Sequence, residues 1–325
     1  MRALMHHEFG NPAEVLSVQD VQIPEPAAGE VRVRTLLSPI HNHDLLTISG
    51  NYGFKPSLPA PSGSEAVGII DAIGEGVSGL EIGQRVATGG TFGVWAEFFI
   101  AKAVALIPVS DAIPDEAAAQ LVAMPFSAIS LVDSLNLKAG DWLVQNAANG
   151  AVGRLVAQLA TARGINVIGL VRRSAGIEEL AAQGIGNIVA TDTEGWAERV
   201  LAIAADSPIV AGVDSVGGKA SGDVLSLIAE NGTLVVFGAM QSPVLELGSA
   251  AIIFKQVTVR GFWGSQVNAS MQAEKRRELM GELFKHLTEG VLTLPVEAIY
   301  SFEEAGVAAQ ANFAPGRAGK ILLRP

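Results

Sequence analysis

A short turn of small residues, set between an apolar run and a helix-like stretch, constrains the fold of this chain more than any other feature. The run Trp142–Gln145 leads into residues 146–153, which read Asn-Ala-Ala-Asn-Gly-Ala-Val-Gly, and apolar residues then recur at helical spacing. Small residues let a backbone approach a phosphate closely, and the first N–H groups of a helix point at its negative charge. The pattern predicts a strand, a phosphate-binding turn and a helix within an α/β domain.

The spacing of Ala147, Gly150 and Gly153 is a variant of the glycine fingerprint of dinucleotide-binding domains. An ordinary strand-to-helix turn could show the same spacing, so the prediction depends on the strand before it and the helix after it. On that basis we assign one group of residues to the pyrophosphate of a dinucleotide: Asn146, Ala147, Asn149, Gly150, Ala151, Val152 and Gly153.

The end of the next expected strand indicates which dinucleotide is bound. An NAD-dependent enzyme usually has Asp or Glu there, which accepts hydrogen bonds from the ribose 2′-hydroxyl. This chain has Arg172, Arg173 and Ser174 instead. Charge-assisted hydrogen bonds to a 2′-phosphate, worth about 1.5 to 3 kcal/mol each, would favour NADPH over NADH by roughly a hundredfold. NADPH is therefore the predicted cofactor, and a solvated basic pair is the alternative interpretation.

From about residue 117 onward, continuous apolar runs alternate with segments long enough to hold helices. This alternation is typical of an α/β fold with an open, doubly wound parallel sheet. Before the first strand, residues 117–132 form an uncharged run that contains Pro125 and is too short to span a bilayer, so we expect a buried helix broken at Pro125. The predicted strands of the sheet are Trp142–Gln145, Asn166–Val171, Ile188–Ala190, 209–213, 233–237 and 257–261.

The first third of the chain has shorter segments, separated by Gly and Pro, which predict a compact β-rich domain. After a charged helix at 273–289, the tail carries Ile299, a helix-like stretch at 303–310 and a strand at 320–323, and it is expected to return to the first domain. We predict a β-rich domain at 1–116, completed by 291–325, and a dinucleotide-binding domain at 117–290. The expected strands of the first domain are 31–36, 66–73, 85–88, 97–100 and 105–107.

Charge and cysteine content exclude several classes of function. A formal net charge of -11 would repel nucleic acids and anionic membrane surfaces, so neither is an expected partner. The chain has no cysteine, which excludes disulfides, thiolate nucleophiles and Cys-type zinc sites and suits a reducing compartment. The first residues lack the apolar stretch of a secretory signal, so we expect a cytoplasmic protein.

Four local sequences resemble the zinc-free branch of the medium-chain dehydrogenase/reductase superfamily, which contains mitochondrial-type 2-enoyl thioester reductases and quinone oxidoreductase-like proteins. They are 49–53 (Ser-Gly-Asn-Tyr-Gly), 145–149 (Gln-Asn-Ala-Ala-Asn), 216–219 (Val-Gly-Gly-Lys) and 260–266 (Arg-Gly-Phe-Trp-Gly-Ser-Gln). The resemblance covers nearly the whole chain and implies a GroES-like catalytic domain joined to a Rossmann domain. Zinc-dependent members have Gly-His-Glu at the metal, whereas residues 63–65 here read Gly-Ser-Glu, so no metal is expected.

The same resemblance implies roles for individual residues. The tyrosine of the Gly-Asn-Tyr-Gly loop is catalytic in enoyl thioester reductases, and it matches Tyr52; Trp263 matches a residue near the nicotinamide and the substrate. A loop tyrosine packed against a neighbour and a core or interface tryptophan are the alternative interpretations. Further cofactor contacts are implied for Ser127, Phe237, Gly238, Ala239, Met240, Phe262 and Trp263.

One segment departs from the family pattern. The family usually has Asn-Pro-x-Asp ahead of the tyrosine loop, and this chain has His41, Asn42, His43 and Asp44. Two imidazoles and a carboxylate suggest a metal site, but on a strand the adjacent Asp would point away from the face that His41 and His43 share. A proton relay or a polar pocket lining is the favoured interpretation.

These residues predict reduction of an activated carbon–carbon double bond. Such a reaction needs a hydride at the β carbon and a proton at the α carbon, and a phenol, with an ordinary pKa near 10, is protonated at neutral pH. The substrate would be a 2-enoyl thioester or a smaller enone or acrylate; the alternatives are a quinone as substrate, or an NADPH-binding protein without catalysis. The resemblance also implies a homodimer, for which 257–262 is the candidate edge strand.

Overall fold

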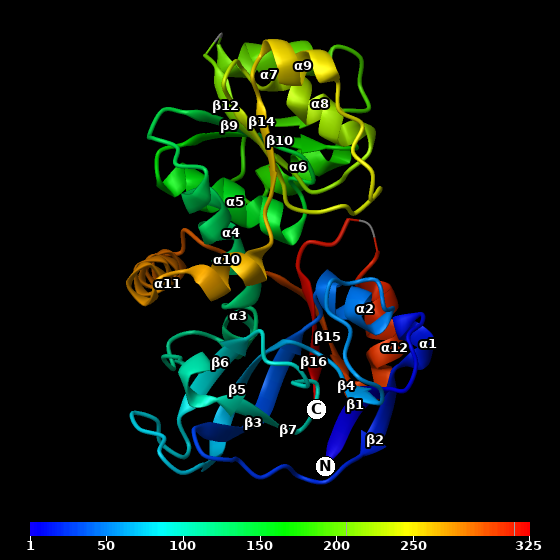
Figure 1. Cartoon of the computed structure of the whole chain (residues 1–325), viewed down its shortest axis with the longest axis vertical. Helices are drawn as coiled ribbons and strands as arrows, with labels where there is room; N and C mark the ends of the chain where they lie inside the picture. The colour runs from blue at the N-terminus through cyan, green and yellow to red at the C-terminus, as the bar shows by residue number, and fades with distance from the viewer. Residues whose placement is uncertain (206, 315) are drawn as a thin grey trace. The chain divides into compact units, whose positions relative to one another are not determined.

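The computed structural model describes residues 1–205, 207–314 and 316–325. The chain divides into two compact units (Figure 1): unit 1 is Met1–Met124 with Leu294–Pro325, and unit 2 is Pro125–Thr293. The end of the chain returns to unit 1, where β16 (Lys320–Arg324) pairs antiparallel with β3 (Glu30–Pro39). Each unit has its own hydrophobic cluster.

Unit 2 contains a parallel sheet with the strand order β11-β10-β9-β12-β13-β14. This confirms the doubly wound α/β class. The order reverses at β9, so the loops after β9 and β12 leave the sheet at the switch point where open α/β sheets bind ligands. The strands are β9 (Trp142–Gln145), β10 (Asn166–Val171), β11 (Ile188–Ala190), β12 (Ile209–Asp214), β13 (Thr233–Val236) and β14 (Thr258–Gly261).

Helix α5 (Ala151–Ala162) follows the predicted turn. Its apolar residues Leu155, Val156 and Leu159 are all buried, as their helical spacing predicts. Full burial of such a side chain contributes about 1.5 to 3 kcal/mol. The remaining helices of the unit, as far as it is described, are α6 (Ala175–Ala181), α7 (Trp196–Ala204), α8 (Lys219–Leu227), α9 (Ser249–Phe254), α10 (Gly264–Ser270) and α11 (Ala273–Thr288).

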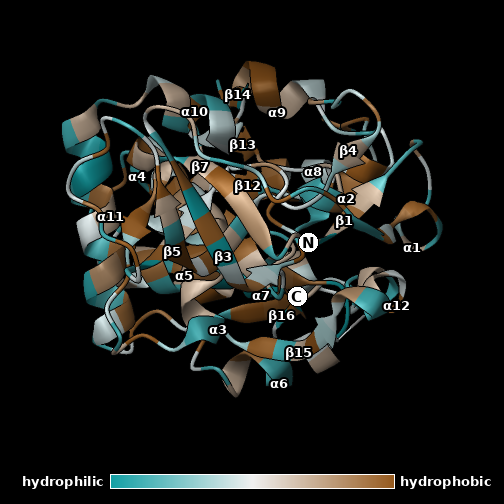
Figure 2. Ribbon diagram, turned by 90° about the horizontal axis from the view of Figure 1, so that it is seen from below, coloured by the Kyte–Doolittle hydropathy of each residue, from teal (hydrophilic) through white to brown (hydrophobic). Residues whose placement is uncertain are grey.

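Two of these helices differ sharply in polarity. Helix α11 coincides with the charged helix expected at 273–289 and is largely hydrophilic, whereas α9 is hydrophobic (Figure 2). Within the described ranges, no helix combines the length and the apolar character that crossing a bilayer requires.

The apolar run at 117–132 forms two helices rather than one helix broken at Pro125. Helix α3 (Asp115–Ala118) ends first, and residues 119–122 separate it from α4 (Ala123–Ser134). Pro125 lies in the first turn of α4, where the backbone N–H has no intrahelical partner to lose. The break precedes the proline, so its expected position was wrong.

Unit 1 is built on two sheets whose strand pairs are antiparallel, except that β15 and β16 pair in parallel. The larger sheet has the order β15-β16-β3-β5-β6-β8, with β7 also paired to β3, and the smaller has the order β2-β1-β4. Most predicted strands coincide with observed ones. The strand expected at 105–107 begins only at Ile107, because the chain turns at η1 (Ala103–Ala105), where the Leu106 N–H donates to the Ala103 carbonyl. The other strands are β1 (Arg2–His6), β2 (Ser17–Asp20), β4 (Ala60–Pro61), β5 (Glu65–Ile73), β6 (Arg85–Gly89), β7 (Phe98–Lys102), β8 (Ile107–Pro108) and β15 (Val296–Ser301).

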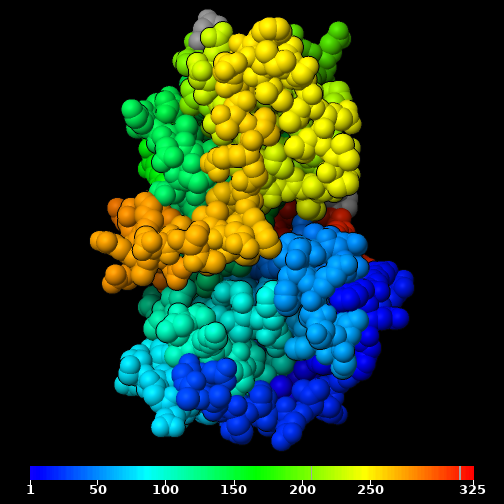
Figure 3. Space-filling view, viewed as in Figure 1, coloured from blue at the N-terminus to red at the C-terminus, as the bar shows by residue number. Residues whose placement is uncertain are grey.

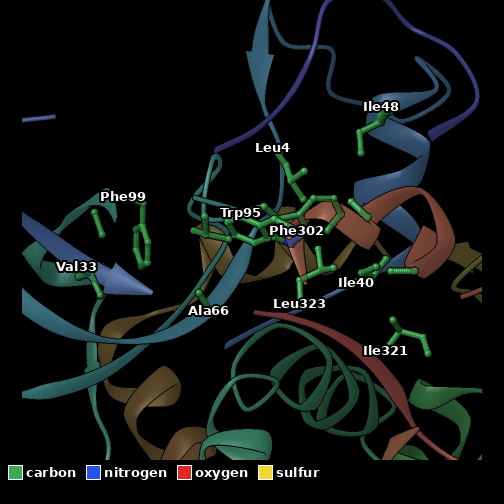
Figure 4. Close-up of a cluster of buried hydrophobic side chains, with 14 of the residues drawn as sticks. Leu4, Val33, Ile40, Ile48, Ala66, Trp95, Phe99, Phe302, Ile321 and Leu323 are labelled. Atoms are coloured by element: carbon green, nitrogen blue, oxygen red, sulfur yellow. The ribbon is translucent and has the colours of Figure 1, made fainter. Parts of the chain in front are cut away.

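The core of unit 1 joins segments from both ends of the chain (Figure 4). Trp95 and Phe302 are its largest fully buried side chains, and they pack with Leu4 of β1 and Leu323 of β16. Phe302 begins η2 (Phe302–Glu304), which leads into α12 (Ala305–Ala311). The C-terminal segment therefore completes this unit.

Candidate functional site

The turn after β9 is shaped by close backbone contacts. Ala147 adopts a left-handed conformation with φ of 49°, and the Gly150 N–H donates to the Ala147 carbonyl over 2.8 Å. A Cβ atom on Gly153 would lie 2.5 Å from the same carbonyl oxygen, so α5 can approach the turn only with glycine at this position. Gly150 is the N-cap of α5 and has no side chain to occupy the N–H groups of its first turn. Those groups remain available to an anion.

A buried carboxylate ties the neighbouring loops to this turn. The Asn146 amide donates to Asp214 over 2.5 Å, and its carbonyl oxygen accepts from the Ser215 N–H over 2.7 Å. Asp214 is fully buried at the end of β12, and it also accepts from the Val216 and Gly217 N–H groups and from the Ser221 hydroxyl. Sequence reasoning missed Asp214; a single carboxylate at the end of an apolar strand was the available signal.

The loops after β13 and β14 lie beside each other. Phe237 and Gly238 donate their N–H groups to the Asp214 carbonyl, and the ring of Phe237 lies 6.0 Å from that of Phe262. The predicted residues Ala239 and Met240 follow in the same loop, and 57% of Met240 is exposed. The structure thus places one group of predicted residues just beyond the carboxyl ends of β13 and β14: Phe237, Gly238, Ala239, Met240 and Phe262.

Two further predicted cofactor contacts, Ser127 and Trp263, lie near the segment that follows β14. Ser127 is half-buried on α4, and a Cβ atom on Gly264 would collide with its hydroxyl. Trp263 is the N-cap of α10, next to Gly264, and is 46% exposed. Ser127 therefore lies against the segment that carries Trp263.

Arg172, Arg173 and Ser174 are exposed directly after β10. Asp192, which the sequence reasoning did not consider, follows the paired strand β11, since Val171 pairs with Ala190. The Ser174 hydroxyl donates to the Asp192 carboxylate over 3.5 Å. A carboxylate therefore stands beside the three residues predicted to bind a phosphate.

Unit 1 holds a group of ionisable and polar side chains that we call the buried polar cluster: His41, His43, Asp44, Ser64, Glu65 and Lys320. His41 is fully buried between Lys320 Nζ, 2.9 Å from its Nδ1, and the Glu65 carboxylate, 2.6 Å from its Nε2. An ammonium only donates, so Nδ1 accepts and Nε2–H donates to Glu65. The other oxygen of Glu65 accepts from the Val122 and Ala123 N–H groups over 2.6 and 2.7 Å.

Burial determines the charges in this chain of bonds. Burial lowers the pKa of His41 well below its usual value, and the Lys320 ammonium lowers it further. Burial raises the pKa of Glu65 to about 7, against the two backbone donors, and lowers the pKa of Lys320 to about 8. Near neutral pH, a neutral imidazole thus separates an ammonium group from a carboxyl group that is close to its pKa.

The second half of the buried polar cluster leads to Tyr52. The Ser64 hydroxyl donates to Asp44 over 2.6 Å and lies 2.7 Å from His43 Nε2. The ring of His43 stacks on that of His41 at 4.9 Å and lies 5.8 Å from the ring of Tyr52. The exposed ring of Phe54, two residues after Tyr52 in the sequence, lies 4.6 Å from that of Phe92. The segment that departs from the family pattern therefore lies beside the predicted catalytic tyrosine through His43.

These side chains are not arranged as a metal site. Among the described residues, no group of three or more His, Cys, Asp or Glu side chains could hold a metal ion. The hydroxyl of Ser64 stands in the Gly-Ser-Glu segment where zinc-dependent dehydrogenases have a histidine, and Glu65 and His41 bond to each other and to Lys320.

Comparisons with known proteins agree with both units. Residues 27–111 match the family model "Alcohol dehydrogenase GroES-like domain", and residues 151–282 match "Zinc-binding dehydrogenase". The chain is 33% identical to the mitochondrial enoyl-(acyl-carrier-protein) reductase of Rattus norvegicus, over 99% of this chain and 88% of the relative.

Solved structures of oxidoreductases are also similar to this chain over its whole length. The quinone oxidoreductase of Pseudomonas syringae pv. tomato is 28% identical, with a TM-score of 0.89 over 100% of this chain and 99% of that one. The Escherichia coli quinone oxidoreductase complexed with NADPH is 25% identical, with a TM-score of 0.90 over 100% of both chains.

Proposed function

Since this chain belongs to the zinc-free branch of the medium-chain dehydrogenase/reductase superfamily, we propose that it is an NADPH-dependent reductase of an activated carbon–carbon double bond. The observation that carries the proposal is the turn at 146–153, where glycine is required at Gly153 and the first N–H groups of α5 are left without a side-chain cap. Such a turn suits a pyrophosphate.

The residues of unit 2 fit a dinucleotide along its length. Gly150 and Gly153 would hold the pyrophosphate, and Arg172, Arg173 and Ser174 the 2′-phosphate, while Ser127, Phe262 and Trp263 would contact the nicotinamide end. When bound, NADPH supplies the hydride. The chain's own contribution is to hold the loops after β9, β12 and β13 together through Asp214.

The proton is assigned to unit 1. We propose that the Tyr52 hydroxyl donates it to the α carbon, or stabilises the negative charge that develops on the conjugated oxygen. The exposed rings of Phe54, in the loop after Tyr52, and of Phe92, packed against that loop, suit an apolar substituent on the substrate. A 2-enoyl thioester, an enone or an acrylate meets these requirements.

Quinone reduction is the second candidate, because the solved relatives named above are quinone oxidoreductases. A comparison of NADPH oxidation with crotonyl-CoA, a simple enone and a benzoquinone separates the two. Turnover of the alkenes, with a loss of about 10²- to 10⁴-fold in Tyr52→Phe at unchanged NADPH affinity, is the expected result. Turnover of the quinone alone, or NADPH binding without turnover of any of them, would contradict the proposal.

We further propose a homodimer formed through unit 2. Strand β14 is at the edge of the sheet, and Ile253 and Phe254 of the adjoining α9 are 57% and 78% exposed. In Figure 3, this part of unit 2 (yellow) forms part of the surface on the viewed face. Exposed apolar residues beside an edge strand favour the pairing of that strand with a second copy of the chain. The monomer has a mass of 33.7 kDa. A mass close to this value by light scattering would exclude the homodimer.

We also propose that the protein is cytoplasmic and binds neither nucleic acid nor membrane surfaces. The lack of cysteine suits a reducing compartment. The net charge of -11 opposes binding to polyanions. Binding of the purified protein to duplex DNA or anionic vesicles at physiological salt would contradict this.

A further inference from the structure

A chain of hydrogen bonds in unit 1 fixes the tautomer of a partly exposed imidazole. The Asp44 carboxylate can only accept, so the Ser64 hydroxyl donates to it over 2.6 Å. The lone pairs of Ser64 are then left for His43, whose Nε2 lies 2.7 Å away, so Nε2 carries a hydrogen. Nδ1 is therefore the nitrogen of neutral His43 that carries no hydrogen.

His43 lies between this chain of bonds and Tyr52. Its ring is 5.8 Å from the ring of Tyr52, and its side chain is 22% exposed, so it can exchange protons with water. Protonated His43 would form an ion pair with Asp44, whose Oδ1 lies 3.6 Å from Nε2. His43 thus lies close both to a carboxylate and to the ring of the proposed proton donor.

We propose that His43 is a proton shuttle that restores the Tyr52 hydroxyl after each turnover, an assignment that rests on the proposed reductase function. Hydride addition at the β carbon leaves an enolate, and the Tyr52 O–H bond breaks as its proton forms a C–H bond at the α carbon. The resulting phenolate takes the Nδ1 proton of the His43 imidazolium. Neutral His43 then takes a proton from water, so one hydride and one proton are consumed in each cycle.

The neighbouring His41 cannot serve in this role. Both of its nitrogens are engaged, with Lys320 and with Glu65, and the residue is fully buried. The charged or titratable groups that face His43 are Asp44 on its own helix α2 (Asn42–Ile48), His41 at the N-cap of that helix, Glu65 of β5 and Tyr52. Lys320 of β16 contacts His41 rather than His43.

The test compares a first turnover with repeated turnovers in His43→Ala. A shuttle is needed only after Tyr52 has given up its proton. NADPH oxidation in a single turnover, with enzyme in excess over NADPH and crotonyl-CoA as the alkene, should therefore match the unaltered protein. The rate of repeated turnover should fall on the order of 10²-fold, and added imidazole should restore it. His7→Asn, at an exposed histidine, is the control and should change neither rate.

The outcomes separate this proposal from the proposed function. Equal single and repeated rates in His43→Ala would overturn the shuttle alone, and so would an equal loss in both rates without imidazole rescue, which indicates that His43 only positions Tyr52. Lack of any alkene turnover by the unaltered protein would overturn the reductase function, and the shuttle with it. If His43→Ala does not fold, Ser64→Ala should show the same pattern with a smaller loss.

A second measurement does not depend on activity. The chain has only five histidines, so ¹⁵N ring resonances can be assigned. Neutral His43 should appear as the Nε2–H tautomer, and Ser64→Ala should shift it toward a mixture of tautomers. An Nδ1–H tautomer in the unaltered protein would contradict the proposed proton path.

Discussion

The two candidate sites of this protein are formed by different chemical groups, backbone N–H groups in one and side chains in the other. The turn at 146–153 in unit 2 is one contiguous segment, and its binding groups are backbone N–H groups positioned by small residues. The buried polar cluster in unit 1 is made by side chains, and His41 meets Glu65 across 24 positions of sequence and Lys320 across 279. A backbone site depends on local spacing, whereas a side-chain site depends on how the whole unit closes.

The largest expected effect follows from this difference. Above pH 7, where the Glu65 carboxyl is ionised, Lys320→Met removes the cation that His41 faces and leaves this buried carboxylate without its counter-charge. Removal of one partner of a buried pair typically costs about 3 to 5 kcal/mol. Lys219→Met is the matched control, because Lys219 forms an exposed pair with Asp223, and it should change stability by about 0.5 kcal/mol or less. Similar thermal unfolding of the two variants would show that the cluster does not hold unit 1 together.

The pH dependence of stability sharpens the same point. Because burial raises the pKa of Glu65 to about 7 in the folded protein, the unfolded chain loses this proton first, near its ordinary pKa of 4.5. The contribution of Glu65 to stability is therefore lost as the pH rises from 4.5 to 7. Glu65→Gln removes that loss, so the variant should gain up to about 3 kcal/mol relative to the unaltered protein across this window.

The measurement is denaturant unfolding of both proteins at several pH values. His41, whose pKa is lowered by burial and by Lys320, has the opposite effect below pH 6.5, but it is present in both proteins and largely cancels in the difference. Glu230→Gln, at an exposed carboxylate, is the control and should show no such gain. A constant difference between Glu65→Gln and the unaltered protein would place the Glu65 carboxyl in contact with water.

The same difference explains what the sequence could predict. Buried parallel strands are apolar runs bounded by turns, so β9, β10 and β11 were predicted with their observed bounds. Strand β12 extends one residue beyond its prediction, to Asp214, because a buried carboxylate does not fit an apolar pattern. The partners of His41 could not be predicted at all, since no periodicity links positions 41, 65 and 320.

Cofactor choice tests whether the side chains after β10 act as predicted. Replacement of both Arg172 and Arg173 by Ala should lower NADPH affinity by roughly a hundredfold and leave NADH affinity nearly unchanged, because only NADPH carries the 2′-phosphate. Asp192→Asn removes the carboxylate beside Ser174 and should raise NADPH affinity severalfold. Fluorescence titration with both dinucleotides measures each effect. Equal losses for NADPH and NADH would assign the arginines a structural role.

The smallest effect concerns a single methyl group in the turn. In Gly153→Ala, the new Cβ would lie 2.5 Å from the Ala147 carbonyl oxygen and 2.9 Å from the Ala148 Cα, and backbone atoms cannot move aside cheaply. The expected cost is about 1 to 3 kcal/mol, although alanine is the better helix former. Gly281→Ala in α11 is the matched control, since open space surrounds it and it should gain up to about 1 kcal/mol. A stabilised Gly153→Ala that still binds NADPH would mean that α5 need not approach the turn closely, and the backbone site would then lose its physical basis.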